Sequence, residues 1–127
     1  MRRYIGSRIK SFGYAFKGVR TLIASQLHAR IHLMATVLVV GLGFYFEVTR
    51  MEWVSLALAM GLVWMGEAVN TAVEFVVDLV SPDHHPLAGK AKDVAAGAVL
   101  LAAIAAAVVG GLVFGPYFLA LGGEAIN

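Results

Sequence analysis

Three long apolar stretches constrain the fold of this chain more than any other feature. They cover about residues 28–46, 53–80 and 93–121, and short polar segments separate them. A helix needs about 20 mostly apolar residues to cross a bilayer, and only helices and closed barrels satisfy their backbone hydrogen bonds in lipid. We therefore predict an all-α membrane protein with three transmembrane helices.

The composition supports a membrane protein. Apolar residues make up 60% of the 127 positions and charged residues only 14%, whereas about a quarter of a soluble domain is charged. This length suits a single domain over residues 1–127, and no repeat or linker divides it. Because the chain has no cysteine, disulfides and thiolate metal sites are excluded.

The N-terminal segment, residues 3–27, combines apolar and basic residues at helical spacing. Its apolar residues recur every three or four positions: Tyr4, Ile5, Ile9, Phe12, Phe16, Val19, Leu22 and Ile23. Four basic residues interrupt them: Arg8, Lys10, Lys17 and Arg20. This pattern predicts an amphipathic helix that lies in the headgroup region of a membrane. An ordinary solvated basic helix is the alternative.

The distribution of cations predicts the orientation. Seven of the ten Lys and Arg residues precede residue 31, Lys90 and Lys92 follow the second span, and Arg50 follows the first. With three spans, the N-terminus and the second loop lie on the same side of the membrane. The positive-inside rule places that side in the cytoplasm.

Four polar residues lie in the second span, where a helix should otherwise face lipid. Glu67, Asn70, Glu74 and Asp78 are spaced by three, four and four residues, which places them on one narrow face of a helix. Acids at membrane depth are costly and by default functional. The stripe therefore predicts a site for a positive group; the alternative is pairing with basic residues of neighbouring helices.

The start of the third span adds a lysine and another acid. Lys92 offers a cation to phosphate oxygens, and Asp93 offers a carboxylate to a metal or nucleotide. Glu74, near the membrane surface, suits Mg²⁺, which binds carboxylates together with phosphates. Glu67 lies deeper, where it could act as a general base on the hydroxyl of a membrane lipid alcohol. No Walker or protein-kinase motif is present, so phosphoryl transfer would use an unrelated framework.

The assembly can also be predicted from residue size. The third span is rich in Ala and Gly over residues 95–111, and small residues let helices approach closely in lipid. A 127-residue chain is too small to enclose a deep polar site alone. We therefore expect a homo-oligomer with sites between subunits.

These residues resemble the small prokaryotic integral-membrane lipid kinases, comprising diacylglycerol kinase and undecaprenol kinase. The resemblance covers nearly the whole chain. Its motifs are GYAFKGVR at residues 13–20, EAVNTAVE and VD at residues 67–74 and 77–78, and AKDVAAGAV at residues 91–99. It implies a homotrimer in the bacterial inner membrane, with three transmembrane helices and a surface helix per subunit. It also implies active sites that are shared between subunits and open to the cytoplasm, with ATP, Mg²⁺ and a membrane lipid alcohol as ligands and no nucleic-acid partner.

The resemblance also assigns roles to the polar residues of the second and third spans. Glu67 resembles the catalytic base and Glu74 a Mg²⁺ ligand. Asn70 and Asp78 would support the site. Lys92 and Asp93 would contact the nucleotide, and they are grouped with Glu67 and Asn70 as catalytic residues.

Further roles fall on the surface helix and on the second loop. Tyr14 resembles part of the adenine-nucleotide site. Three loop residues are also expected near the nucleotide: Asp83, His84 and His85. Three residues of the surface helix are expected to bind the lipid substrate: Ser7, Phe16 and Arg20.

One position departs from the family pattern. The family commonly has a second metal-ligating glutamate at the end of the surface helix, and this chain has Gln26 there. An amide is a poorer Mg²⁺ ligand than a carboxylate. Either the metal affinity is lower, with Glu74 and the ATP phosphates holding the ion, or the chain is impaired as an enzyme.

The substrate and the function class have alternatives. The sequence HHPLA at residues 84–88 and the Ala-Ala-Gly-Ala run at residues 95–98 resemble the undecaprenol kinase branch, so undecaprenol is favoured over diacylglycerol. A function from another class is a small cation- or proton-coupled transporter with Glu67 and Glu74 as its ion site. The lack of inverted repeats argues against it. His28 and His32 share a helix face, and we expect them to contact headgroups.

Overall fold

A computed structural model describes the backbone of residues 2–124 and the side chains of residues 10–122. This part of the chain forms four helices: α1 (Arg2–Ser25), α2 (Leu27–Tyr45), α3 (Arg50–Val80) and α4 (Pro86–Glu124). Three of them, α2, α3 and α4, are long and apolar enough to cross a membrane. The prediction of an all-α chain with three candidate spans is confirmed.

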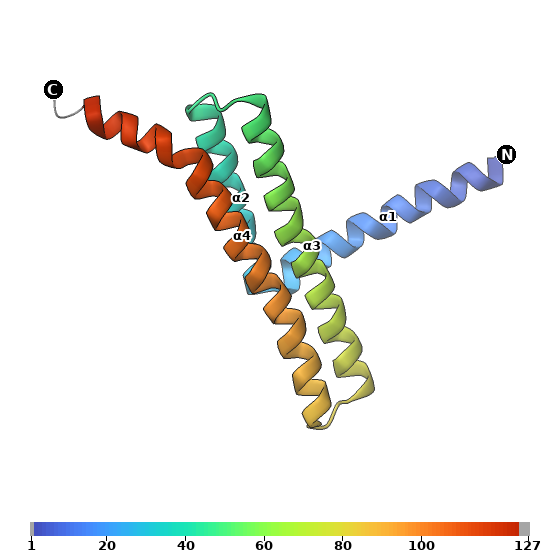
Figure 1. The fold of residues 1–127 in the computed structure, drawn as a ribbon. Coiled ribbons are helices and arrows are strands. Elements are labelled where there is room, and N and C mark those ends of the chain that lie inside the picture. Colours follow the sequence, from blue (N-terminus) through green and yellow to red (C-terminus); the bar gives the residue numbers. More distant parts are fainter. Residues whose placement is uncertain (1, 125–127) are drawn as a thin grey trace.

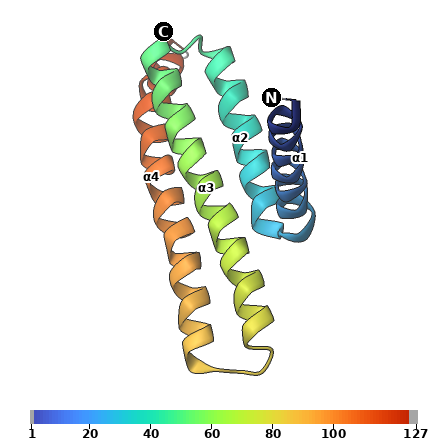
Figure 2. The ribbon, with the colours of Figure 1, turned by 90° about the vertical axis from the view of Figure 1, so that its right-hand side faces the viewer.

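The helices form a three-helix bundle with a projecting arm. Helices α3 and α4 run antiparallel, side by side, and residues 81–85 join them (Figure 1). Helix α2 packs beside α3. The end of α3 and the start of α4, with the loop that joins them, extend beyond the start of α2 (Figure 2). Helix α1 leaves the bundle at the start of α2 as an arm (Figure 1).

Gln26 forms the corner between α1 and α2. Its backbone is extended, with φ −112° and ψ 123°, and this single residue separates the two helices. The Arg30 guanidinium donates hydrogen bonds to the carbonyl oxygens of Ile23 and Ala24 at 3.1 and 2.7 Å. Basic side chains commonly satisfy the free carbonyls at the end of a helix in this way. The corner is therefore fixed, and it carries the Gln26 side chain toward α3.

Two helices begin earlier than predicted. Helix α3 begins at Arg50, because Thr49 and Glu52 form a capping box that satisfies free backbone N–H groups. Helix α4 begins at Pro86, so it includes part of the polar segment that precedes the predicted span of about residues 93–121. Proline favours the first position of a helix, where its missing N–H group costs nothing.

A close contact between α2 and α3 lies at the end of the bundle near residues 46–49. Gly43 is buried against the ring of Trp53, and a Cβ atom at Gly43 would lie 2.6 Å from Trp53 Cη2. The Trp53 ring also contacts the ring of Phe44, with ring centroids 5.1 Å apart. A small residue is therefore required where the two helices cross.

We expect Gly43→Val to lower the free energy of unfolding by about 1–3 kcal/mol, the usual cost of overpacking. Gly41→Val is the matched control, because a Cβ atom at Gly41 would meet nothing within 4 Å. Both variants carry the same change in helix propensity. Reversible unfolding with SDS in detergent micelles measures the difference. Equal losses in the two variants would show that contact with Trp53 is not the cause.

Candidate active site

The polar stripe of α3 runs from the buried interior of the bundle to its surface. Glu67 is 2% exposed and Asn70 is 8% exposed. Glu74, one turn further along, is half-buried, and Asp78 is exposed. The predicted spacing thus produces a graded series of polar groups along one helix. Glu67 and Asp78 are 11 residues apart, about 16 Å at 1.5 Å per residue.

Glu74 joins α3 to the corner between α1 and α2. Gln26 Nε2 donates a hydrogen bond to Glu74 Oε2 at 3.0 Å, and Asn70 Nδ2 donates one to Glu74 Oε1 at 3.1 Å. Both carboxylate oxygens are therefore satisfied by neutral amides. The position predicted as a doubtful metal ligand, Gln26, does lie beside the predicted metal ligand Glu74.

A cavity of about 280 Å³ surrounds Glu67. Helix α2 lines it with His28 and His32, and α3 lines it with Glu67 and Asn70. Helix α4 contributes only apolar residues: Ala96, Val99, Leu100 and Ala103. Glu67 Oε2 lies 3.9 Å from His32 Nε2. Such a cavity can hold a small polar group, such as a hydroxyl, beside a carboxylate.

A second cavity, of about 310 Å³, lies where α3 passes into α4. Lys92 Nζ forms an ion pair with Asp78 Oδ1 at 2.5 Å at its edge. The loop adds Asp83, His84 and His85 to the lining. Both members of the ion pair are substantially exposed, and exposed pairs contribute little to stability. Lys92 is therefore able to exchange Asp78 for another anion.

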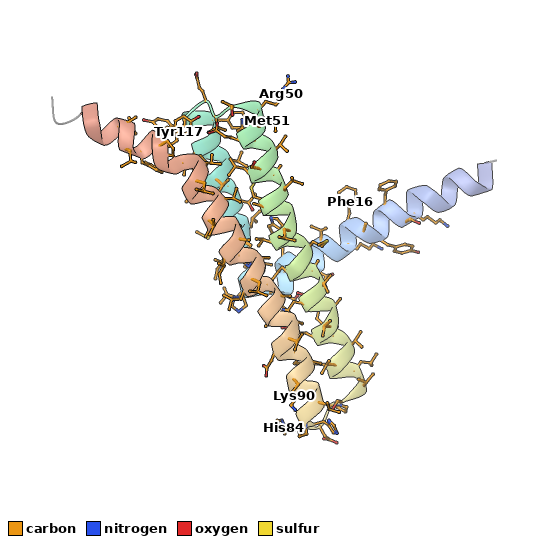
Figure 3. All side chains as sticks on the ribbon, in the orientation of Figure 1. Phe16, Arg50, Met51, His84, Lys90 and Tyr117 are labelled. Atoms are coloured by element: carbon orange, nitrogen blue, oxygen red, sulfur yellow. The ribbon has the colours of Figure 1, made fainter. Side chains whose placement is uncertain are left out.

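The structure separates the remaining predicted residues from these two cavities. Tyr14, Phe16 and Arg20 are exposed on α1, and Phe16 projects from the arm away from the end of the bundle that carries His84 and Lys90 (Figure 3). Asp93 is exposed on α4 and lines neither cavity. The Ser7 side chain lies outside the described side chains.

His32 is the site residue that sequence reasoning missed. We expected it to contact headgroups together with His28, but the structure places both in the cavity beside Glu67. The signal was present in the sequence, because an ionisable residue inside a span usually faces the bundle interior. The same argument that singled out Glu67 applied to His32.

Comparison with known proteins identifies the family of this site. The prokaryotic diacylglycerol kinase family matches residues 13–114, which include both cavities and the stripe. The chain belongs to this family.

Relatives within the family carry two names. The chain is 36% identical to undecaprenol kinase of Bacillus subtilis over 115 residues, which cover 91% of this chain and 94% of that protein. It is 46% identical to diacylglycerol kinase of Synechocystis over 112 residues, covering 87% of this chain and 64% of that protein. It is 35% identical to diacylglycerol kinase of Escherichia coli K12 over 100 residues, which cover 79% of this chain and 82% of that protein. The predicted family and the predicted kinase activity are confirmed, and the transporter alternative has no support.

Proposed function

We propose that this protein transfers the γ-phosphoryl group of ATP to the hydroxyl of a membrane lipid alcohol. The observation that carries the proposal is the polar stripe of α3. It connects a buried carboxylate, Glu67, to a polar cavity at the end of the bundle that contains Lys92. A lipid hydroxyl and a nucleotide could each occupy one end of this stripe.

The nucleotide end is the cavity of about 310 Å³. Lys92 supplies the cation that phosphate oxygens need, and it can leave Asp78 for a phosphate because their ion pair is exposed. His84 and His85 add hydrogen-bond donors on the loop. Asp93, one residue beyond Lys92 on α4, is proposed to contact the nucleotide from outside this cavity.

Mg²⁺ fits the middle of the stripe when phosphates share it. In the part of the chain that the structure describes, no three carboxylate or imidazole groups converge on one point. Glu74 provides one carboxylate, and the buried Asn70 Oδ1 accepts no hydrogen bond. Mg²⁺ commonly takes one or two carboxylates and completes its shell with water and phosphate oxygens. Glu74, with Asn70 Oδ1 and a reoriented Gln26 amide, would hold the ion, which when bound would neutralise charge on the phosphates.

The acceptor end is the cavity around Glu67. A lipid hydroxyl placed there gives its proton to the Glu67 carboxylate as its oxygen forms a bond to the γ-phosphorus. The bond between the γ-phosphorus and the β–γ bridging oxygen breaks, and ADP leaves. Glu67 is suited to this role because it is buried in a candidate membrane span and lines a cavity that could accept the hydroxyl.

We favour undecaprenol over diacylglycerol as the substrate. The HHPLA sequence at residues 84–88 supports this choice, as does the relative named undecaprenol kinase, which aligns over nearly its full length. In addition, a second apolar cavity of about 280 Å³ shares His32 and Ala103 with the cavity of Glu67 and continues toward Met60 and Gly110. Its apolar lining suits a hydrocarbon chain. Mixed micelles with labelled ATP, supplied with either lipid, test the substrate: faster phosphorylation of diacylglycerol would reverse the choice.

We further propose a homotrimer in the bacterial inner membrane, with α1 at the cytoplasmic surface. Tyr14, Phe16 and Arg20 are exposed on an arm that points away from the nucleotide cavity of its own chain. Several small residues of α4 are exposed as well, among them Ala96, Ala98, Ala105 and Ala107, and they offer a surface for close helix contacts. A site shared between subunits brings α1 of one chain to α3 of another.

The first prediction concerns the base. Glu67→Gln keeps the shape of the side chain but cannot take up the proton, so turnover should fall by about two to four orders of magnitude. ATP binding, measured by titration of a fluorescent nucleotide, should remain within about twofold. Near-normal turnover in this variant would show that Glu67 is not the general base.

The second prediction concerns the metal. Gln26→Glu adds a carboxylate 3.0 Å from the oxygen of Glu74 that Gln26 now contacts, so it should lower the Mg²⁺ concentration for half-maximal activity. Glu74→Gln should nearly abolish activity. An unchanged Mg²⁺ requirement in Gln26→Glu would place residue 26 outside the coordination shell.

The third prediction concerns the shared site. Glu67→Gln and Tyr14→Ala should each be nearly inactive, but mixed trimers contain some sites that carry neither change. Co-reconstitution of the two variants should therefore restore part of the activity. Differently tagged subunits must first be shown to exchange by co-purification. No recovery after verified exchange would mean that each site is built within one chain.

A further inference from the structure

Glu67 is buried without a strong cation. It is the one carboxylate among residues 10–122 that is almost completely buried, at 2% exposure. Arg30, the arginine of α2, is engaged elsewhere: it donates hydrogen bonds to carbonyl oxygens at the end of α1. A buried carboxylate needs a hydrogen-bond donor or a charge partner. Among the described residues, His32 is the ionisable group that pairs with Glu67.

His32 is held on the correct side of α2 for this contact. Thr36 Oγ1 donates a hydrogen bond to the His32 carbonyl oxygen at 2.8 Å, and Trp64 Nε1 donates one to Thr36 Oγ1 at 3.0 Å. Trp64 lies one turn before Glu67 on α3. This chain of hydrogen bonds fixes the α2 turn that carries His32 against the α3 turn that carries Glu67.

The surroundings leave His32 few other partners. The titratable groups that line the cavity of Glu67 are His28, His32 and Glu67 itself, and the residues of α4 there are apolar. His32 also lines the apolar cavity that continues toward Gly110, so it lies where the two cavities meet. The His32 side chain is 20% exposed, and its Nε2 atom lies 3.9 Å from Glu67 Oε2.

We propose that His32 is a positioning residue for Glu67: its Nε2–H group holds Glu67 Oε2, so that Oε1 faces the hydroxyl of the lipid alcohol. This inference rests on the proposed kinase function and adds a residue to its machinery. The atoms need to approach by less than about 1 Å to reach hydrogen-bond distance, and catalytic hydrogen bonds are often long before substrate binds. Holding one oxygen removes rotations of the carboxylate that would misdirect the proton transfer.

The test compares two substitutions at position 32. His32→Leu removes the donor and should lower kcat by about 10- to 100-fold, the usual cost of losing such a supporting hydrogen bond. The KM for ATP should stay within about twofold. His32→Gln keeps an N–H donor at a similar reach and should recover most of the lost kcat. Equal losses in the two variants would overturn the proposal.

A double-mutant cycle separates positioning from general damage. If His32 acts through Glu67, then His32→Leu should cause little further loss of turnover in the Glu67→Gln background. A structural defect would instead lower turnover by the same factor in both backgrounds and would overturn the proposal. The wild-type protein is assayed alongside with undecaprenol and diacylglycerol. Failure of the wild type on both lipids counts against the proposed function, whereas additive losses in an active enzyme count only against the role of His32.

Discussion

The burial of two carboxylates between apolar helices is the constraint on which this structure depends. Glu67 is buried and Glu74 is half-buried on α3, and unpaired charges in such surroundings are costly. Two neutral amides, Gln26 and Asn70, donate hydrogen bonds to Glu74, and His32 Nε2 lies 3.9 Å from Glu67 Oε2. These contacts, with the bond between Trp64 and Thr36, form a polar seam between α2 and α3. The candidate active site and the packing of these two helices therefore use the same interactions.

The sequence predicted those parts of the molecule that depend on periodicity. Three apolar stretches gave three helices, and the spacing of Glu67, Asn70 and Glu74 gave one helix face, because both follow from the geometry of a single helix. The start of α4 at Pro86 was not evident from the sequence, since proline in a polar segment resembles a loop signal. The contact of His32 with Glu67 depends on how α2 packs against α3. No pattern within one helix specifies that packing.

The contacts within a single chain account for the polar residues of α3 but not for the predicted site residues of α1. Glu67, Asn70 and Glu74 have partners from α1, α2 or α3 of the same chain, so their geometry needs no second subunit. Tyr14 and Phe16 are exposed on an arm that the rest of the chain does not cover. Large exposed apolar groups on a membrane protein face either lipid or another chain. In the proposed homotrimer, the arm is thus the element whose function would depend most on assembly.

Gln26 shows how a change of one functional group alters the requirements of such a site. Two carboxylates at the present separation of Gln26 and Glu74, 3.0 Å between the closest atoms, would repel each other unless a cation or a proton lay between them. An amide at residue 26 removes that repulsion and donates a hydrogen bond instead. In the proposed metal site, this amide would leave one fewer charged oxygen for Mg²⁺. Since Mg²⁺ normally arrives with ATP, a site of this kind depends on the phosphates to complete the coordination of the ion. Its affinity for metal and its affinity for nucleotide should therefore be coupled more strongly than in a site with two carboxylates.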